Sequence, residues 1–291
     1  MTDKIIISGF ADEIDAQLDV QLKVVKGLGM NHICLRAADG KGIAEYGVDE
    51  FAQNILPRLN AAGVKVSSLG SPIGKIDVAD EQAYETQLRQ LDTLCQICKL
   101  VDCRYIRVFS FWMPKGENPD DYTDTVLEKL SGFARVAEQY DVILIHENEK
   151  AIYGDTGRRC KVILEQLASP HFKAAFDFAN FVQCGEDPAA CWELLKEYVV
   201  YIHIKDAVAG KNENVLCGTG DGKIAQILTQ AIREEGYEGF LTLEPHLVLF
   251  DTFQSLETGD AGKVIFENKA KNGAEGFTMQ YRALVDILNT I

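Results

Sequence analysis

Short apolar runs rich in β-branched and aromatic residues alternate along the chain with longer stretches that carry apolar positions at helical spacing. Eight runs are predicted strands: Lys4–Ile7, Asn31–Arg36, Val64–Ser68, Arg104–Phe109, Val142–Ile145, Lys173–Asp177, Val199–Ile204 and Phe240–Glu244. Eight stretches are predicted helices: Asp15–Leu28, Asp49–Ala62, Ala79–Leu100, Asp120–Tyr140, Arg158–Leu167, Asp187–Glu197, Lys223–Glu235 and Glu275–Ile291. Gly63 is the expected C-cap of the second helix, and the long stretches Ala207–Gly222 and Pro245–Gly273 are expected to be structureless. Strand starts recur every ~34 residues, the length of one strand–helix unit. This alternation predicts an α/β fold, a (β/α)8 TIM barrel that forms a single domain over residues 1–291.

Alternation within each strand predicts which side chains enter the barrel, because residues two apart share a face. In the seventh strand, Val200, Ile202 and Ile204 form an apolar set that is expected to pack on the helices. Tyr201, His203 and Lys205 are then expected to point inward. The same reasoning places further side chains inside the barrel: Cys34, Arg36, Ile143, Ile145, Glu147, Ala175, Asp177, Thr242 and Glu244.

Strands five to eight each end with an inward side chain of a type that binds metals: Glu147, Asp177, His203 and Glu244. Adjacent strand ends converge at the mouth of a barrel, where three carboxylates would repel one another unless a cation neutralised them. Taken singly, such an Asp or Glu is usually a solvated or helix-capping residue, and a single His is usually a core residue. Together the four predict a site for one divalent ion, with Mn²⁺ favoured and Mg²⁺, Co²⁺ or Zn²⁺ as alternatives.

Several sequence motifs resemble those of the xylose isomerase-like TIM barrels, a superfamily of sugar isomerases and epimerases that also includes endonuclease IV. The markers are Gly9-Phe-Ala-Asp-Glu13, Ile145-His-Glu-Asn-Glu149, Phe176-Asp-Phe-Ala-Asn180, His203-Ile-Lys-Asp206 and Leu243-Glu-Pro-His246. The resemblance implies that Glu147, Asp177, His203 and Glu244 hold the metal and that both glutamates act as acid/base catalysts. It also implies a homodimer or homotetramer.

The expected activity is metal-dependent isomerisation or epimerisation of a sugar or polyol, through an enediolate, with Glu147 and Glu244 moving the proton. Alternatives are a metal-dependent lyase or dehydratase acting on a cyclic polyol or keto-sugar, and a non-catalytic sugar-binding subunit. The motifs depart from many relatives at Glu149, which stands where those relatives have a histidine. Asp177 is also not followed by the histidine that several relatives have. These departures leave the substrate open.

Further residues near the strand ends are candidates for binding the substrate. Arg36, Arg107 and Lys205 would orient hydroxyls or carboxylates, or else form structural ion pairs. Trp112 offers an apolar wall for a sugar face, or packs over the barrel rim. Glu149 and His246 lie just beyond the predicted ligands. The glycine-rich segment 218–222 is interpreted as a tight turn into a helix, with backbone binding of a phosphate as the alternative.

Charge and composition disfavour several classes of binding partner. The chain has 291 residues, with 29 Lys+Arg against 44 Asp+Glu and a formal net charge of −15, which disfavours nucleic acid and anionic membranes. Five histidines are too few for the multinuclear zinc site of endonuclease IV. Neither a signal peptide nor a membrane span is predicted. The eight cysteines, including Cys95-Gln-Ile-Cys98, are interpreted as reduced thiols of a cytoplasmic protein.

Overall fold

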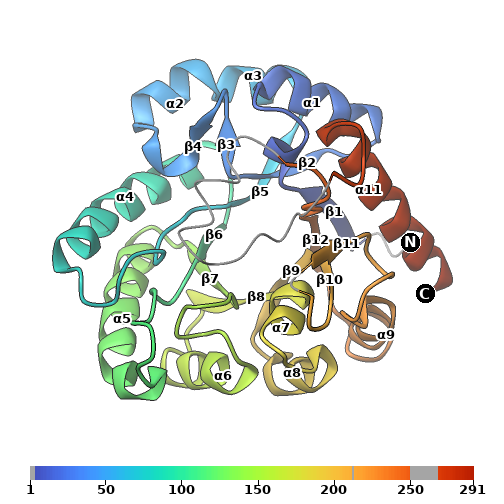
Figure 1. Ribbon diagram of the computed structural model, residues 1–291. Coiled ribbons are helices and arrows are strands. Elements are labelled where there is room, and N and C mark those ends of the chain that lie inside the picture. Colours follow the sequence, from blue (N-terminus) through green and yellow to red (C-terminus); the bar gives the residue numbers. More distant parts are fainter. Residues whose placement is uncertain (1–3, 212, 250–267) are drawn as a thin grey trace.

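Eight parallel strands form one sheet that curls into a barrel, in the order β1-β12-β9-β8-β7-β6-β5-β2 (Figure 1). The structure is a computed structural model that describes residues 4–211, 213–249 and 268–291. The strands are β1 (Ile5–Gly9), β2 (His32–Leu35), β5 (Lys65–Leu69), β6 (Tyr105–Val108), β7 (Ile143–Glu147), β8 (Phe172–Asp177), β9 (Val199–Ile204) and β12 (Gly239–Leu243). A parallel bridge between Phe10 and Cys34 joins the two ends of the sheet. The predicted TIM barrel is confirmed.

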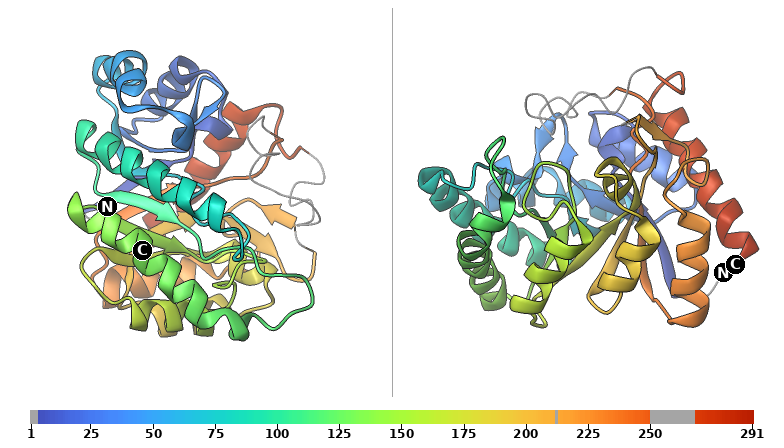
Figure 2. Two further views of the ribbon diagram at one scale, coloured as in Figure 1. Left: turned by 90° about the vertical axis from the view of Figure 1, so that its left-hand side faces the viewer. Right: turned by 60° about the horizontal axis from the view of Figure 1, so that its bottom comes forward.

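Helices surround the barrel in an outer layer, which the two views of Figure 2 show from the side. The helices are α1 (Leu18–Gly27), α2 (Val48–Asn54), α3 (Leu56–Ala62), α4 (Glu81–Leu100), α5 (Thr123–Gln139), α6 (Gly157–Gln166), α7 (Phe178–Gln183), α8 (Pro188–Leu195), α9 (Ile224–Thr229) and α11 (Gly273–Thr290). Shorter turns are η1 (Ala11–Glu13), η2 (Ile43–Glu45), η3 (Pro119–Tyr122) and the π-helical η4 (Gln230–Glu234). Each predicted helix has a counterpart here, and α7 was not predicted.

Two predicted helices differ from the observed ones. The helix expected over Asp49–Ala62 is divided into α2 and α3 at Ile55, because Pro57 has no N–H and its ring clashes with the preceding turn. The helix expected over Lys223–Glu235 starts as α9 and then widens into η4. Gly63 ends α3 in the left-handed region with φ 62°, as its expected role as a helix C-cap requires.

The segment Ala207–Gly222 was expected to be structureless, and that expectation is wrong. It contributes to an antiparallel hairpin of β10 (Asp206–Val208) and β11 (Glu213–Val215) that follows β9. A second small hairpin, β3 (Ala37–Ala38) with β4 (Lys41–Gly42), follows β2. Of the other stretch expected to be structureless, Pro245–Gly273, residues 250–267 lie outside the described residues.

The two faces of the strands divide as predicted, with one exception. Ile202 and Ile204 pack in the large core between strands and helices, whereas Ile145, Ala175 and Tyr201 form a separate cluster inside the barrel. Val200 packs against this inner cluster, so its predicted outward position is wrong. The cause is a register shift between β8 and β9 at this point, which interrupts the alternation of side chains.

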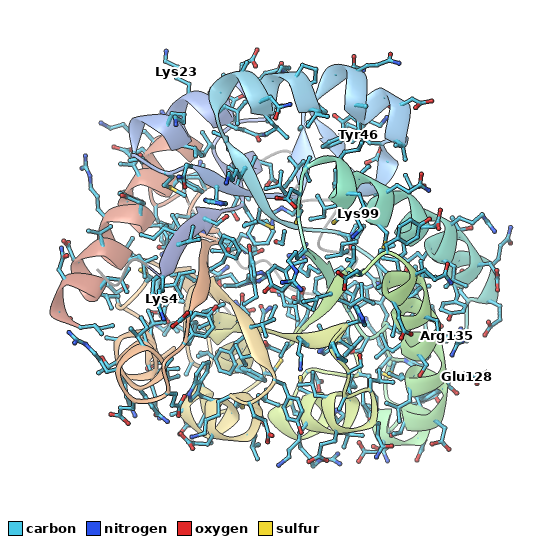
Figure 3. All side chains as sticks on the ribbon, turned by 180° about the vertical axis from the view of Figure 1, so that it is seen from behind. Lys4, Lys23, Tyr46, Lys99, Glu128 and Arg135 are labelled. Atoms are coloured by element: carbon cyan, nitrogen blue, oxygen red, sulfur yellow. The ribbon has the colours of Figure 1, made fainter. Side chains whose placement is uncertain are left out.

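The outer surface of the helices carries charged side chains such as Lys23, Lys99, Glu128 and Arg135, labelled in Figure 3. Among the described residues, no helix is long and apolar enough to cross a membrane. All eight cysteines are free thiols. Cys95 and Cys98 are both buried in α4, and burial raises the pKa of Cys95 to about 12. This environment fits two packed neighbours on one helix and does not suit a reactive thiol.

Candidate metal centre and polar pocket

Four neighbouring strands bring the predicted ligand side chains together. Glu147 and Asp177 end β7 and β8, His203 lies in β9, and Glu244 directly follows β12. These strands are adjacent in the sheet. Each residue offers one ligand atom, and these atoms all lie within 4.8 Å of one another, with all four residues buried. The expected convergence at one end of the barrel is therefore present in the structure.

Asp177 is held in place by its neighbours. Its Oδ1 accepts a hydrogen bond from the Asn180 amide at 2.8 Å and thereby caps α7, while Oδ2 lies 3.1 Å from Lys205 Nζ. The side chain of Asn148 donates to the Asp177 carbonyl at 2.9 Å and accepts from its amide at 3.0 Å. Asn180 also reaches Glu147 Oε1 at 3.4 Å. Asn148 and Asn180 thus fasten the ends of β7 and β8 to each other.

His203 faces two of the carboxylates. Its Nδ1 lies 2.8 Å from Glu147 Oε1 and 3.6 Å from Glu244 Oε2. Its Nε2 is buried and has no hydrogen-bond partner among the described residues. The ring packs edge-on against Phe10, with centroids 5.1 Å apart. Because Nδ1 lies against two of the carboxylates, it is the ring nitrogen placed to bind an ion together with them.

Three cations contact the ligand carboxylates. Arg107 Nη1 lies 3.1 Å from Glu147 Oε2, and Arg36 Nη1 lies 3.0 Å from Glu244 Oε1. Lys205 Nζ lies 3.4 Å from Glu244 Oε2, and it also contacts Asp177 Oδ2 at 3.1 Å. All three cations are buried. Structural ion pairs were one of the two roles predicted for these residues, the other being orientation of substrate groups. The three cations also line a pocket.

Asp12 and Glu13, in η1 after β1, complete the surroundings of Arg36. Arg36 Nε lies 2.8 Å from Asp12 Oδ2, and Nη2 lies 3.3 Å from Glu13 Oε1. Glu13 further accepts a hydrogen bond from the His246 amide at 2.7 Å through Oε2. Both acidic residues belong to a motif that was recognised in the sequence, but their place in the site was not predicted. Their position directly after the first strand is the feature of the sequence that could have placed them in the site.

The two glutamates of the cluster are ionised. Burial acts to raise the pKa of Glu147, but the charges of His203 and Arg107 outweigh it and lower this pKa to about 2. Burial likewise opposes the ionisation of Glu244, and the charge of Lys205 in particular holds its pKa well below the usual range. Two carboxylates that stay charged at neutral pH can hold a cation or accept a proton.

Burial is the main cause of the pKa shifts of two other acids and one histidine. Burial raises the pKa of Asp177 to about 7, with Lys205 acting in the opposite direction. Burial raises the pKa of Glu13 to about 8, against the charge of Arg36. Burial, with Lys205 nearby, lowers the pKa of His246 well below its usual range. His246 is therefore a neutral imidazole next to the cluster.

A pocket opens beside the cluster. It is lined by polar side chains: Arg36, Lys75, Arg107, Glu149, Asn180, Gln183, Lys205, Asn214, Glu244 and His246. Glu149 forms an ion pair with Lys75 at 2.7 Å. Trp112, the predicted apolar wall, is not among the lining residues and lies behind Lys75, whose Nζ is 5.7 Å from its ring centre. Lys75, Gln183 and Asn214 are lining residues that sequence reasoning missed.

The glycine-rich segment 218–222 is arranged around Asp206. The backbone amides of Gly218 and Gly220 donate to Asp206 Oδ2, and the amide of Gly222 donates to Oδ1, each at 2.9 Å. These amides are used by a carboxylate of the chain itself. The interpretation as a turn into a helix therefore describes this segment better than a phosphate cradle.

The sequence model of the xylose isomerase-like TIM barrel family matches residues 22–258. The chain belongs to this family. Among curated proteins, none matches the sequence. A resemblance to this group of TIM barrels was already expected from the motifs at the strand ends, and the family match confirms it.

Solved structures with the same barrel include three of particular interest. The IolI protein, solved with a bound zinc atom, is 13% identical with a TM-score of 0.76, and 98% of each chain is covered. D-allulose 3-epimerase from Methylomonas sp., in complex with D-allulose, is 13% identical with a TM-score of 0.73, covering 99% of this chain and 98% of the other. The 3-keto-D-glucoside 4-epimerase YcjR from E. coli is 15% identical with a TM-score of 0.69, covering 98% and 99%. At these low sequence identities, the structural similarity establishes that this chain shares their fold.

The four clustered residues of this family member fit a divalent ion. Three carboxylates and one imidazole are a donor set that suits Mn²⁺, Mg²⁺, Co²⁺ or Zn²⁺. His203 Nε2 is buried and makes no hydrogen bond with any described residue, whereas Asp177 Oδ2 is held by the ion pair with Lys205 at 3.1 Å. Lys205 contacts two of the carboxylates and would share their charge with the ion.

Proposed function

We propose that the protein is a divalent-metal-dependent isomerase or epimerase of a small sugar or polyol, with Mn²⁺ as the favoured ion. One observation carries this proposal: Glu147, Asp177, His203 and Glu244 place their ligand atoms within 4.8 Å of one another in a buried cluster. A bound ion would polarise the carbonyl and the neighbouring hydroxyl of the substrate. This would favour loss of the proton from the carbon that bears the hydroxyl.

Glu147 and Glu244 are the proposed acid/base pair. Each has one oxygen next to a guanidinium, Oε2 of Glu147 with Arg107 and Oε1 of Glu244 with Arg36. The other oxygen of each faces His203. These contacts hold each carboxylate in one orientation. One ionised carboxylate can remove a proton next to the substrate carbonyl and thereby becomes protonated. The other carboxylate first takes up a proton from solvent and then returns it to the same carbon from the opposite side, and the first releases its proton to solvent.

The pocket supports a polyhydroxylated substrate. All of its lining side chains are polar and can donate to or accept from several hydroxyl groups at once. Lys75 and Glu149 form a charged pair in the wall that can donate to one hydroxyl and accept from its neighbour. The net charge of −15 supports a small substrate in preference to nucleic acid.

The test is proton exchange on a panel of ketohexoses, pentoses, inososes and keto-glycosides in D₂O. The enzyme is stripped of metal and assayed without metal and with Mn²⁺. We expect at least one compound to gain deuterium next to its carbonyl and to change configuration only when Mn²⁺ is present. Turnover that loses water would instead identify a dehydratase. No exchange with any compound and ion would contradict the proposal and favour a binding subunit.

A further inference from the structure

Both glutamates of the cluster turn one oxygen toward the histidine and keep the other oxygen bound to an arginine. Glu147 Oε1 lies 2.8 Å from His203 Nδ1, whereas its Oε2 lies 3.1 Å from Arg107 Nη1. Glu244 Oε2 lies 3.6 Å from His203 Nδ1, whereas its Oε1 lies 3.0 Å from Arg36 Nη1. We call the oxygens toward the histidine the front oxygens and the other two the rear oxygens. A guanidinium group therefore occupies the rear oxygen of each glutamate.

Asp177 shows the same division, which it reaches by a different route. Its Oδ1 accepts the amide hydrogen of Asn180 at 2.8 Å and caps α7, so this is the rear oxygen. Its front oxygen, Oδ2, lies 3.1 Å from Lys205 Nζ. The side chain of Asn148 bonds both the amide and the carbonyl of Asp177 and fixes its backbone. The carboxylate cannot offer both oxygens to one ion unless the cap of α7 is given up.

Lys205 is a cation that already rests on the cluster. Its Nζ lies 3.1 Å from Asp177 Oδ2 and 3.4 Å from Glu244 Oε2, and both of these are front oxygens. The side chain of Lys205 is buried, and it also lines the pocket. The positive charge that the chain itself places here is thus received by front oxygens. This contact supports the front oxygens as the ones that are offered to an ion.

Further contacts hold the two guanidinium groups on the rear oxygens. Arg36 Nε lies 2.8 Å from Asp12 Oδ2. Arg107 donates to the carbonyls of Gly70 and Ser71, at 3.2 Å and 3.4 Å. Both arginine side chains are buried, and a guanidinium keeps its charge in a protein. An ion that approached a rear oxygen of either glutamate would therefore meet a fixed positive charge.

We propose that the cluster binds its ion through the three front oxygens and His203 Nδ1, and that Arg36 and Arg107 are positioning residues that select against Ca²⁺. Four donor atoms, one of them a nitrogen, suit a small divalent ion such as Mn²⁺ and leave further positions for water or substrate. Ca²⁺ usually takes more oxygen ligands, often both oxygens of one carboxylate, and here the second oxygens are occupied. The inference rests on the proposed function, because it presupposes the metal centre.

The first test is a crystal structure of the full chain with Mn²⁺. We expect the ion to contact one oxygen of each carboxylate, with both arginines still on the rear oxygens. Mn²⁺ bound through both oxygens of a carboxylate would overturn the inference and leave the metal centre in place. A structure without Mn²⁺ at the four residues would overturn the proposed function, and this inference with it.

The second test measures selectivity in solution. The metal-free wild-type protein is titrated separately with Mn²⁺ and with Ca²⁺, and the two Kd values are compared by calorimetry. We expect Ca²⁺ to bind at least about 100-fold more weakly than Mn²⁺, because the site lacks the extra oxygens that Ca²⁺ uses. Ca²⁺ that binds as tightly as Mn²⁺ would overturn the inference, while the binding of Mn²⁺ would still support the proposed function.

The third test frees one rear oxygen. Arg107→Met leaves Glu147 Oε2 without its guanidinium, so both oxygens of Glu147 can then contact a larger ion. The ratio of the Ca²⁺ Kd to the Mn²⁺ Kd should fall about tenfold. The matched control is Lys75→Met, which removes one positive charge from the same pocket and leaves the rear oxygens occupied. The control should keep the wild-type ratio.

Circular dichroism and urea unfolding establish that each variant is folded. If Arg107→Met does not fold, Arg107→Gln replaces it, because the shorter amide removes the charge but keeps a group that can donate to a backbone carbonyl. An unchanged ratio in a folded variant of Arg107 would overturn its selective role. An equal fall in Lys75→Met would also overturn it, because the effect would then follow from charge alone.

Discussion

Two layers of side chains inside the barrel differ sharply although the same strands supply both. The lower layer contains Tyr201 and Thr242, whose hydroxyls are 2.6 Å apart, with Ile145 and Ala175 beside them. Two residues further along the same strands, the upper layer contains the four clustered ligands, with the cations Arg36 and Arg107 beside them. The lower layer is neutral and its polar groups are paired. The upper layer is charged, and its buried His203 Nε2 makes no hydrogen bond within the described part of the chain.

The comparison indicates that stability and function reside in different layers of one barrel. Apolar packing and paired hydroxyls stabilise the fold, whereas buried like charges and unpaired polar atoms cost free energy and persist where a site needs them. Changes in the upper layer should therefore remove activity with little loss of stability, and changes in the lower layer should do the reverse.

The largest effect is expected from Glu147→Gln and Glu244→Gln. Each replacement keeps the shape of the side chain but removes a carboxylate that can accept a proton, so kcat/KM should fall by about a hundredfold or more. Circular dichroism and urea unfolding should show a folded protein. Glu165→Gln, on the exposed face of α6, is the matched control and should keep wild-type kinetics. Full activity in either site variant would contradict the assigned acid/base roles.

Tyr201→Phe tests the lower layer. The phenol oxygen accepts from Ser68 at 3.0 Å and from Thr242 at 2.6 Å, so its removal leaves buried hydroxyls without this partner. The free energy of unfolding should fall by about 1–3 kcal/mol in urea titrations, with kcat/KM within about threefold of wild type. The control is Tyr105→Phe, which removes the hydroxyl of a neighbouring ring that also faces inward. A large loss of activity without a loss of stability would break the division between the layers.

Lys75→Met addresses the rim above the upper layer. Lys75 lies 2.7 Å from Glu149 Oε2 in the pocket wall and contacts none of the four ligands in the structure. If the pair binds substrate hydroxyls, KM should rise about tenfold while kcat stays close to wild type. Lys23→Met, on the exposed face of α1, controls for the loss of one positive charge. An unchanged KM would remove this pair from the substrate site.

The sequence allowed the barrel and the four clustered residues to be predicted because both follow from alternation along strands. Helix periods and strand periods are local properties, and inward positions two residues apart can be counted. The same counting failed at Val200, where a register shift depends on how β9 pairs with β8. The break at Pro57 was visible in the sequence as a proline inside an otherwise helical pattern.

The polar residues around the ligands could not be predicted in the same way. Asn148, Asn180 and Asn214 act through hydrogen bonds to atoms far away in the sequence, and nothing in their own neighbourhood specifies those partners. Asp206 likewise gains its role only when the glycine-rich segment folds back onto it. Such contacts are set by tertiary structure, which short-range patterns do not contain.

Metal binding tests the central claim most directly. The metal-free protein is titrated with Mn²⁺ and followed by calorimetry, beside His203→Ala and the control His171→Ala. We expect wild type and His171→Ala to bind one ion per chain. His203→Ala should lose more than the roughly 10- to 100-fold in affinity that is typical of an outer partner of a metal ligand. Equal Mn²⁺ binding by wild type and His203→Ala, or no binding by either, would contradict a metal centre at the ends of β7, β8, β9 and β12.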